Sequence, residues 1–502
     1  MSHPKETNMQ PLFFSKFSRI NLFILTLLFV FQINFAQNPK PNDENRPRGQ
    51  GQGQRRGEGG QRGQNGGGQN RQPATFQTDV PAHNWDIVAG RPTKNSLTLS
   101  ILAYQDTEGS IVYGTEKGKY PNQTSKQNFK KDEPFELVLN GLKPNARYFY
   151  QFRNNLENSQ EFSFTTAKPA NTDFTFAIQA DSHLDEGVDT DTYKRSLENV
   201  AKANSDFLVD LGDTFMCDKR GNEWKDAAAN YLAQRYYFGS IGHSVPIFLT
   251  LGNHDGEAGW RGGEMFDWSN MMRKTYFPNP VPNDFYSGNK ANMQNYFAWE
   301  WGDAQFIVLD PFSFTRRNKG SDNWGWTLGK EQYDWLKNTL EKSQAKYKFV
   351  FIHHLVGGGN DVARGGSEAA QFWEWGGKNF EGKDEFAEKR PDLAMPIHQL
   401  FVQNKVSAVF HGHDHIFVKQ DLDGIVYQEV PQPGHRQVDN TRNAEEYGYK
   451  SGVIKGSSGV LIVKVSKEKA TVSYVRAFPN NRQSEGRKDG NIDYEYEIMK
   501  SK

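Results

Sequence analysis

The stretch 174-FTFAIQADSH-183 decides the fold of the larger part of this 502-residue chain. In it, a run of mostly apolar residues ends in Asp181 and His183, two side chains that can bind metals or carry protons. A short apolar run of this kind is typical of a strand that is buried on both faces of a sheet. Five further segments repeat the pattern: 207-FLVDLG-212, 246-PIFLTLG-252, 305-QFIVLD-310, 348-KFVFIHH-354 and 406-VSAVFHG-412.

Amphipathic patterns lie between several of these strands. Apolar residues recur at helical spacing in three intervals, 190–203, 223–238 and 329–343. Two further strands, antiparallel and at an edge of the sheet, are predicted at 459–465 and 470–475. Buried strands that alternate with helices predict a layered α/β domain, which we place at residues 169–502.

A different rhythm precedes this domain. Short strand-like runs alternate with turns at 97–102, 110–113, 135–139, 148–152 and 162–166. They predict a small all-β sandwich over residues 76–168. The segment 142-LKPNARYFYQF-152 resembles the corner before a late strand in fibronectin type III modules, and the resemblance implies a spacing or partner-binding role for this sandwich.

The N-terminus has the pattern of an export signal. Lys16 and Arg19 precede an apolar run at 22–35, and the small residue Ala36 is followed by polar sequence. An uncleaved membrane anchor is the alternative, but the run is short for a spanning helix. We therefore predict a signal peptide at 1–36, and a periplasmic, cell-surface or secreted protein without a transmembrane span in its mature form.

Residues 37–75 consist mainly of Gly, Gln, Asn and Arg and cannot bury enough apolar surface to fold. We predict a disordered tether, whose local excess of arginine would allow loose contact with an anionic envelope; a purely solvated linker is the alternative. The whole chain has 60 basic and 60 acidic residues, so no nucleic-acid partner is expected. Its single cysteine, Cys217, excludes an intramolecular disulfide framework.

The chemistry lies at the ends of the predicted buried strands. Five polar blocks occur there in the order Asp181-Ser-His183, Gly212-Asp213, Gly252-Asn253-His254-Asp255, His353-His354 and Gly412-His413-Asp-His415. Any single block is weak evidence, because Asp and His at strand ends often cap helices. Together they supply the six or seven carboxylate, imidazole and amide ligands that two metal ions need.

This ordered set resembles the calcineurin-like metallophosphoesterase superfamily, and the fibronectin-like front resembles its purple acid phosphatase branch. The resemblance implies a four-layer α/β/β/α catalytic domain that binds two metal ions. One ion would be held by Asp181, His183 and His415, the other by Asn253, His353 and His413, with Asp213 bridging them. His353 is the histidine of its pair that matches the family ligand, and His354 is the alternative.

One position departs from the purple acid phosphatase pattern. That branch has a tyrosine ligand three residues after the bridging aspartate, where this chain has Met216. A coloured ferric tyrosinate centre is therefore not expected. Ligand type alone leaves the metals open among Mn, Fe and Zn.

The resemblance implies hydrolysis of small-molecule phosphate esters by metal-activated hydroxide, in the manner of an acid phosphatase on monoesters. In this interpretation His254 faces the substrate and Asp255 orients His254. One alternative is a phosphodiesterase that acts on cyclic nucleotides or glycerophosphodiesters. An alternative of another class is a surface binding module without catalysis.

Two long loops, 256–295 and 357–386, follow ligand blocks and are expected to border the site. From them, Trp260 and Arg364 are candidates for substrate binding, and His435 is a third candidate from a later loop. The alternative for the aromatic residues is that they only pack the loops. Cys217 is interpreted as a buried core residue rather than a redox-sensitive thiol.

Overall fold

The computed structural model describes residues 74–316 and 322–500, all of which belong to one compact unit. The predicted signal peptide at 1–36 lies outside the described residues, and so does nearly all of the predicted tether at 37–75. Within the described ranges, no helix is both long enough and apolar enough to cross a membrane.

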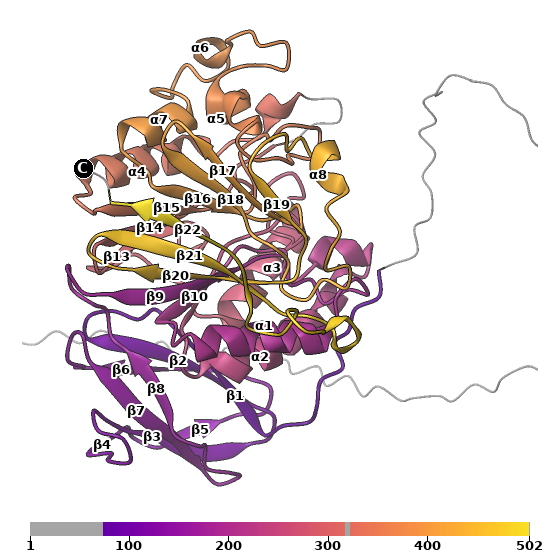
Figure 1. Cartoon of the computed structure of the whole chain (residues 1–502). Coiled ribbons are helices and arrows are strands. Elements are labelled where there is room, and N and C mark those ends of the chain that lie inside the picture. The colour runs from indigo at the N-terminus through magenta and orange to yellow at the C-terminus, as the bar shows by residue number, and fades with distance from the viewer. Residues whose placement is uncertain (1–73, 317–321, 501–502) are drawn as a thin grey trace, which may run out of the picture. The chain divides into compact units, whose positions relative to one another are not determined.

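The first part of the described chain is an antiparallel β-sandwich (Figure 1). Its smaller sheet has the order β1-β2-β6, with β1 (Trp85–Gly90), β2 (Ser96–Ala103) and β6 (Phe135–Asn140). The larger sheet contains β3 (Thr107–Gly114), β4 (Asn122–Gln123), β5 (Gln127–Phe129), β7 (Arg147–Asn154) and β8 (Phe162–Thr165). Apolar side chains from both sheets form one buried cluster. The five predicted strands correspond to β2, β3, β6, β7 and β8.

The predicted corner is also present. The hydroxyl of Tyr148 accepts a hydrogen bond from the backbone N–H of Lys143 at 2.8 Å, so the tyrosine closes the turn that precedes its own strand. This is the arrangement that a tyrosine corner requires. The resemblance to fibronectin type III modules itself stays a prediction.

The second part contains two mixed sheets. The six-stranded sheet has the order β11-β10-β9-β20-β21-β22. Its strands are β9 (Phe174–Gln179), β10 (Phe207–Asp210), β11 (Ile247–Leu249), β20 (Gly459–Val465), β21 (Lys469–Arg476) and β22 (Ile492–Met499). The first three run parallel to one another, and β20, β21 and β22 continue the sheet with antiparallel pairs.

The eight-stranded sheet has the order β12-β13-β14-β15-β16-β18-β17-β19. Its strands are β12 (Ser287–Gly288), β13 (Phe297–Trp301), β14 (Ala304–Val308), β15 (Tyr347–Phe351), β16 (Ala408–His411), β17 (Phe417–Leu422), β18 (Ile425–Glu429) and β19 (Val453–Lys455). The parallel pairs are β14–β15, β15–β16 and β16–β18. The six apolar runs predicted as buried strands are thus all strands of these two sheets.

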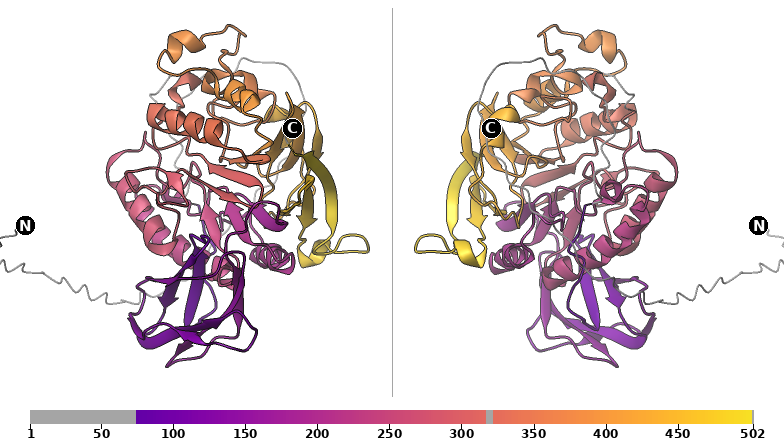
Figure 2. Two further views of the ribbon diagram at one scale, coloured as in Figure 1. Left: turned by 90° about the vertical axis from the view of Figure 1, so that its left-hand side faces the viewer. Right: turned by 90° about the vertical axis from the view of Figure 1, so that its right-hand side faces the viewer.

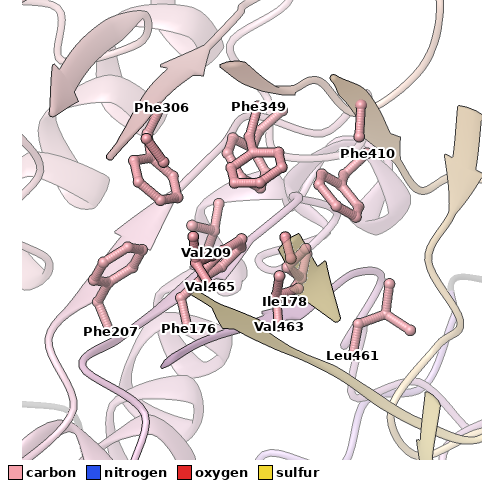
Figure 3. Packing of buried hydrophobic residues seen from close by; sticks show 14 of the residues in the cluster. Phe176, Ile178, Phe207, Val209, Phe306, Phe349, Phe410, Leu461, Val463 and Val465 are labelled. Carbon is pink, nitrogen blue, oxygen red and sulfur yellow. The ribbon is translucent and has the colours of Figure 1, made fainter. Parts of the chain in front are cut away.

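The two sheets face each other across an aromatic core. Phe176, Phe207, Phe306 and Phe349, which come from both sheets, belong to the same buried cluster (Figure 3). Successive residues of a strand point to opposite faces, and on β9 the neighbouring residue Ala177 lies in a different cluster, under the helices. The run 174–179 is mostly apolar because both of its faces are covered.

Helices cover the outer faces of both sheets, which gives the predicted α/β/β/α layering (Figure 2). The helices α1 (Thr190–Lys202) and α2 (Ala228–Gly242) pack on the six-stranded sheet, and α4 (Gly329–Lys342) and α7 (Ile397–Gln403) pack on the eight-stranded sheet. The remaining helices are α3 (Gly263–Tyr276), α5 (Trp373–Gly376), α6 (Phe386–Lys389) and α8 (Asn443–Glu446). Short 3₁₀ helices occur at Cys217–Arg220, Trp224–Ala227, Asn323–Gly325, Ala369–Gln371 and Asn480–Arg482.

Two sequence predictions need correction. The helix predicted at 223–238 begins as a 3₁₀ turn, and α2 proper extends to Gly242. The strands predicted at an edge, β20 and β21, lie inside the six-stranded sheet, because β20 pairs with β9 and the unpredicted strand β22 forms the edge.

Candidate metal centre

All five polar blocks meet at one end of the two sheets. Asp181 and Asp213 follow the parallel neighbours β9 and β10, and Asn253 follows β11 beside them. His353 and His413 follow β15 and β16, which are parallel neighbours in the other sheet. The carboxyl ends of parallel strands lie at the same edge of a sheet, so residues far apart in sequence are brought together.

Glycines allow the ligand-bearing loops to touch. A Cβ atom on Gly252 would lie 2.0 Å from the backbone nitrogen of Asp213, and one on Gly412 would lie 2.7 Å from Oδ2 of Asp181. No side chain fits at either distance. Gly252 and Gly412 are therefore required for the close approach of the neighbouring loops.

A first potential ligand group surrounds Oδ1 of Asp181. Nε2 of His415 lies 3.5 Å from this oxygen and Nε2 of His183 lies 3.6 Å from it. One ligand atom from each of the three residues lies within 4.8 Å of the other two. Two of these residues follow β9 and the third follows β16, so the group draws on both sheets.

A second potential ligand group consists of Asp213, His353 and His413. Nε2 of His353 lies 3.3 Å from Oδ2 of Asp213 and 3.0 Å from Oδ1 of Asn253. The same Oδ2 of Asp213 lies 3.7 Å from Nε2 of His183 in the first group. The Asp213 carboxylate thus lies between the two groups, where a bridging ligand belongs.

The chemistry of these atoms fits metal ions. Oδ1 of Asp181 and Nε2 of His183 are buried and have no hydrogen-bond partner among the described residues. His353 contacts the carbonyl of Leu211 through Nδ1 at 2.8 Å, and His413 contacts the carbonyl of Val362 through Nε2 at 2.9 Å. An imidazole that donates one N–H to a carbonyl keeps a lone pair on its other nitrogen for a metal.

The charges of the candidate ligand residues also favour metal binding. Burial alone would lower the pKa of His353, but the carboxylates of Asp213 and Asp181 raise it to about 9. Positive charge beside these buried carboxylates is therefore stabilising. Divalent ions would supply that charge, with the histidines neutral and acting as ligands.

The backbone of the ligand residues is in an uncommon conformation. Positive φ angles occur at Asp181 (61°), His183 (42°), Asp213 (55°), His413 (82°) and His415 (58°). Such angles cost free energy in residues with side chains and persist where the surrounding structure enforces them, as it does at functional sites. The loops are thus held in shape by the fold.

The neighbouring His354 is not part of either group. Its Nδ1 contacts the carbonyl of Leu355, and its ring packs edge-on against Phe312 and Trp326. The geometry therefore favours His353 as the ligand of the pair.

His254 stands beside the shared carboxylate. Its Nε2 lies 2.9 Å from Nδ2 of Asn253 and 3.9 Å from Oδ2 of Asp213, and its side chain is 21% exposed. Its Nδ1 lies 2.9 Å from Oδ1 of Asp218, whose other oxygen accepts a hydrogen bond from Arg261 at 2.7 Å. Asp218 orients the ring, a role that sequence analysis did not assign because the two residues are 36 positions apart.

Asp255 does not orient His254, contrary to our expectation. Its buried carboxylate accepts hydrogen bonds from the backbone N–H groups of Gly252, Asp213, Thr214 and Phe215, at 2.8 to 3.1 Å. Four N–H donors from two loops use both of its oxygens. Asp255 therefore holds the GNHD block against the GD block.

The three predicted substrate residues have different surroundings. Arg364 donates to the carboxylate of Asp414 at 2.7 Å and lies over the ring of Tyr447, so its charge is already paired. Trp260 packs against Trp326 and Phe312, which supports the packing alternative for this residue. Arg364 also donates to the carbonyl of the candidate ligand His413 at 3.0 Å, and His435 lies beside His415, with the two ring centres 6.4 Å apart.

Met216 and Cys217, which follow the shared Asp213 closely in sequence, both lie in the interior of the protein. Met216, at the position of the tyrosine ligand in purple acid phosphatases, is buried. Cys217 is fully buried, and burial raises the pKa of its thiol to about 12. A thiol in this state is unreactive, so the interpretation of Cys217 as a core residue is confirmed.

Two groups of hard and borderline candidate ligands that share a carboxylate, at the strand ends of an α/β/β/α fold, define a class: the two-metal hydrolases. The family model for the calcineurin-like phosphoesterases matches residues 174–417. Residues 174–417 thus form a calcineurin-like phosphoesterase domain, and the protein is a metal-dependent hydrolase of phosphate esters.

Related proteins point to the same superfamily. A probable purple acid phosphatase 20 of Arabidopsis thaliana is 24% identical over 361 residues, which cover 68% of this chain and 72% of the relative. The structure of PhoD aligns with a TM-score of 0.59 at 16% identity, over 81% of this chain and 88% of that one. Purple acid phosphatase PPD1 from yellow lupin (Lupinus luteus) seeds aligns with a TM-score of 0.55 at 14% identity, over 83% and 74%. The solved structures share the fold.

Proposed function

We propose that this protein is an exported phosphatase that hydrolyses small-molecule phosphomonoesters in the manner of an acid phosphatase. The observation that carries the proposal is the position of the Asp213 carboxylate, whose Oδ2 lies 3.3 Å from His353, 3.7 Å from His183 and 3.9 Å from His254. One oxygen thus joins two ligand groups and faces the histidine that we assign to the substrate.

The metal-ligand assignment is part of this proposal. Asp181, His183 and His415 would hold one ion, Asn253, His353 and His413 would hold the other, and Asp213 would be shared. When bound, two such ions lower the pKa of water and offset the negative charge of the phosphate group. With Met216 in place of tyrosine, Mn, Fe and Zn all remain candidates.

The remaining roles belong to side chains of this chain. His254 donates a hydrogen bond or a proton from Nε2 to the leaving oxygen, and the Asp218 carboxylate fixes the ring in that orientation. Arg261, whose side chain is 42% exposed, presents a guanidinium group next to Asp218. A guanidinium fits the terminal oxygens of a monoester, which carry more charge than those of a diester.

Two arms of one experiment test the proposal. The chain from residue 37 onward is purified, its metal content is measured, and it is assayed on monoesters, diesters and pyrophosphate at several pH values. We expect about two metal ions per chain and a kcat/KM on monoesters at least tenfold above that on diesters. The reverse preference would establish the phosphodiesterase alternative, and no hydrolysis of any compound would establish the binding-module alternative.

Export is proposed on the pattern of residues 1–36 alone, and loose envelope contact on the arginines of the tether. Fractionation of cells that express the whole chain tests both. We expect the protein outside the cytoplasm with a new N-terminus near residue 37. Recovery of the intact chain from the cytoplasm would contradict export.

A further inference from the structure

Helix α2 makes contact with both the sandwich and the candidate metal centre. Two adjacent side chains on this helix, Gln234 and Arg235, are fully buried although both are polar. Burying such groups is unfavourable unless their hydrogen bonds are made within the protein. Their partners therefore show which parts of the chain this helix connects.

Gln234 holds the two loops that carry Asp181, His183 and Asp213. Its side-chain nitrogen donates to Oγ of Ser182 at 2.8 Å and to the carbonyl of Thr214 at 3.1 Å. Ser182 lies between the two ligands of the DSH block, and Thr214 directly follows the shared carboxylate. One amide thus fixes the spacing between the first two ligand-bearing loops.

Arg235 points the other way, into the sandwich. Its guanidinium group forms an ion pair with the carboxylate of Asp86 on β1 and donates to Oγ and to the carbonyl of Ser100 on β2, each at 3.0 Å. It also donates to the carbonyl of Tyr276 at 2.7 Å. Moving this buried charge away from its partners would be unfavourable, because the guanidinium group would be left unpaired.

The surface of the helix is shaped for this contact. A Cβ atom on Gly239 would lie 2.9 Å from Cβ of Asp86, and one on Gly242 would lie 3.4 Å from the carbonyl oxygen of Ile87. The last turn of α2 is also held, since the hydroxyl of Tyr150 donates to the carbonyl of His243 at 2.6 Å. The sandwich therefore contacts α2 from Arg235 to the C-terminal end of the helix, through β1, β2 and β7.

We propose that the sandwich is a brace for the metal centre. Asp86 and Ser100 fix Arg235, and the helix carries this constraint to Gln234 and so to the ligand loops. Gln234 and Arg235 are positioning residues, since neither belongs to a ligand group. Ligand loops with positive φ angles need such external support, and the sandwich supplies part of it. The inference rests on the metal ligands assigned under the proposed function.

The test uses four variants of the full mature chain: Asp86→Asn, Gln234→Met, the double variant, and the control Ile111→Val. The control removes one methyl group from the sandwich core on β3, away from α2. Zn²⁺ affinity is measured by competition with a chelator at a temperature where every variant is folded. Amide hydrogen exchange of residues 181–184 and 213–216 is measured on the metal-free protein.

We expect Gln234→Met to lower Zn²⁺ affinity by about 10- to 100-fold, as the loss of partners that orient metal ligands does elsewhere. Asp86→Asn should lower it several-fold and speed exchange in both loops, although Asp86 lies in the sandwich. In the double variant, the effect of Asp86→Asn on Zn²⁺ affinity should vanish, because the connection through Gln234 is already broken. Ile111→Val should change neither quantity.

Two results would contradict the proposal that the sandwich supports the metal centre. One is an Asp86→Asn protein with lowered thermal stability but unchanged Zn²⁺ affinity and loop exchange; the other is effects that simply add in the double variant. Should Asp86→Asn not fold, Ser100→Ala removes a single hydrogen bond and answers the same question. A wild-type chain that binds no Zn²⁺, Mn²⁺ or Fe²⁺ would instead refute the ligand assignment, so the two failures are distinguishable.

Discussion

Replacing Asp218 with asparagine tests the proposed role of His254 most directly. The carboxylate lies 2.9 Å from Nδ1 of His254, which places Nε2 2.9 Å from Nδ2 of Asn253 and 3.9 Å from the shared carboxylate of Asp213. An asparagine has the same size but carries no charge, and its amide can present N–H to the ring instead of an acceptor. The variant therefore keeps the shape of the site and releases the orientation of the histidine.

The expected magnitude follows from this hydrogen bond. A hydrogen bond to a charged group contributes about 1.5–3 kcal/mol. Because about 1.4 kcal/mol corresponds to a tenfold change in rate, loss of the oriented ring should lower kcat about 10- to 100-fold. Arg261 loses its partner as well, but its side chain is 42% exposed and can be solvated, so this loss adds little.

The assay compares two monoesters, p-nitrophenyl phosphate and an alkyl phosphate. The alkyl ester should lose more activity, because its leaving oxygen is far more basic and needs the proton of His254. Metal content should not change, since Asp218 lies outside both ligand groups. As a matched control, Arg261→Gln keeps the contact between Asp218 and His254 and should raise KM more than it lowers kcat. A metal-replete Asp218→Asn enzyme with kcat within twofold of wild type on both esters would refute the reasoning.

Gly252→Ala should strip metal from the folded protein, because its Cβ would lie 2.0 Å from the backbone nitrogen of Asp213; full metal content by elemental analysis would contradict this. Cys217 should not react with a thiol reagent at pH 8 until the protein is denatured, because it is fully buried and its pKa is raised to about 12; rapid labelling of the native protein would be the contrary result. Burial lowers the pKa of His243 from 6.5 to about 4, so the unfolded state binds the proton first and stability should fall as the pH falls through that window, by at most about 3 kcal/mol. Denaturant unfolding of wild type and His243→Gln at pH 7 and pH 4.5 checks this, and an equal pH dependence of the two proteins would show that His243 contributes nothing.

The sequence predicted the sheets well where both faces of a strand are covered. Strands such as β9 and β15 are mostly apolar because one face meets the other sheet and the other meets helices. The strand β22 escaped prediction because it lies at an edge, and its alternation of exposed and half-buried residues gives a weak signal. Strands that are buried on both faces were predictable from sequence, whereas the exposed edge strand was not.

The candidate site was predictable to the extent that it consists of short blocks. The residues of both ligand groups each lie within a few residues of the end of a strand, so their convergence follows from parallel pairing. The surroundings of those blocks were not predictable. Asp255 is next to His254 in sequence but points to the backbone of another loop, whereas Asp218 reaches His254 through a turn that no local pattern encodes.

Both ligand groups take residues from both sheets. Bound ions would therefore affect the stability of the fold as well as catalysis. Asp181 and Asp213 belong to the six-stranded side, and His353, His413 and His415 to the eight-stranded side. Each ion would therefore cross-link the two halves of the domain and stabilise the folded chain by mass action, because only the folded chain assembles its ligands. Chelation should therefore lower the melting temperature of the catalytic domain as well as abolish hydrolysis, and metal supply would govern how long the folded protein survives.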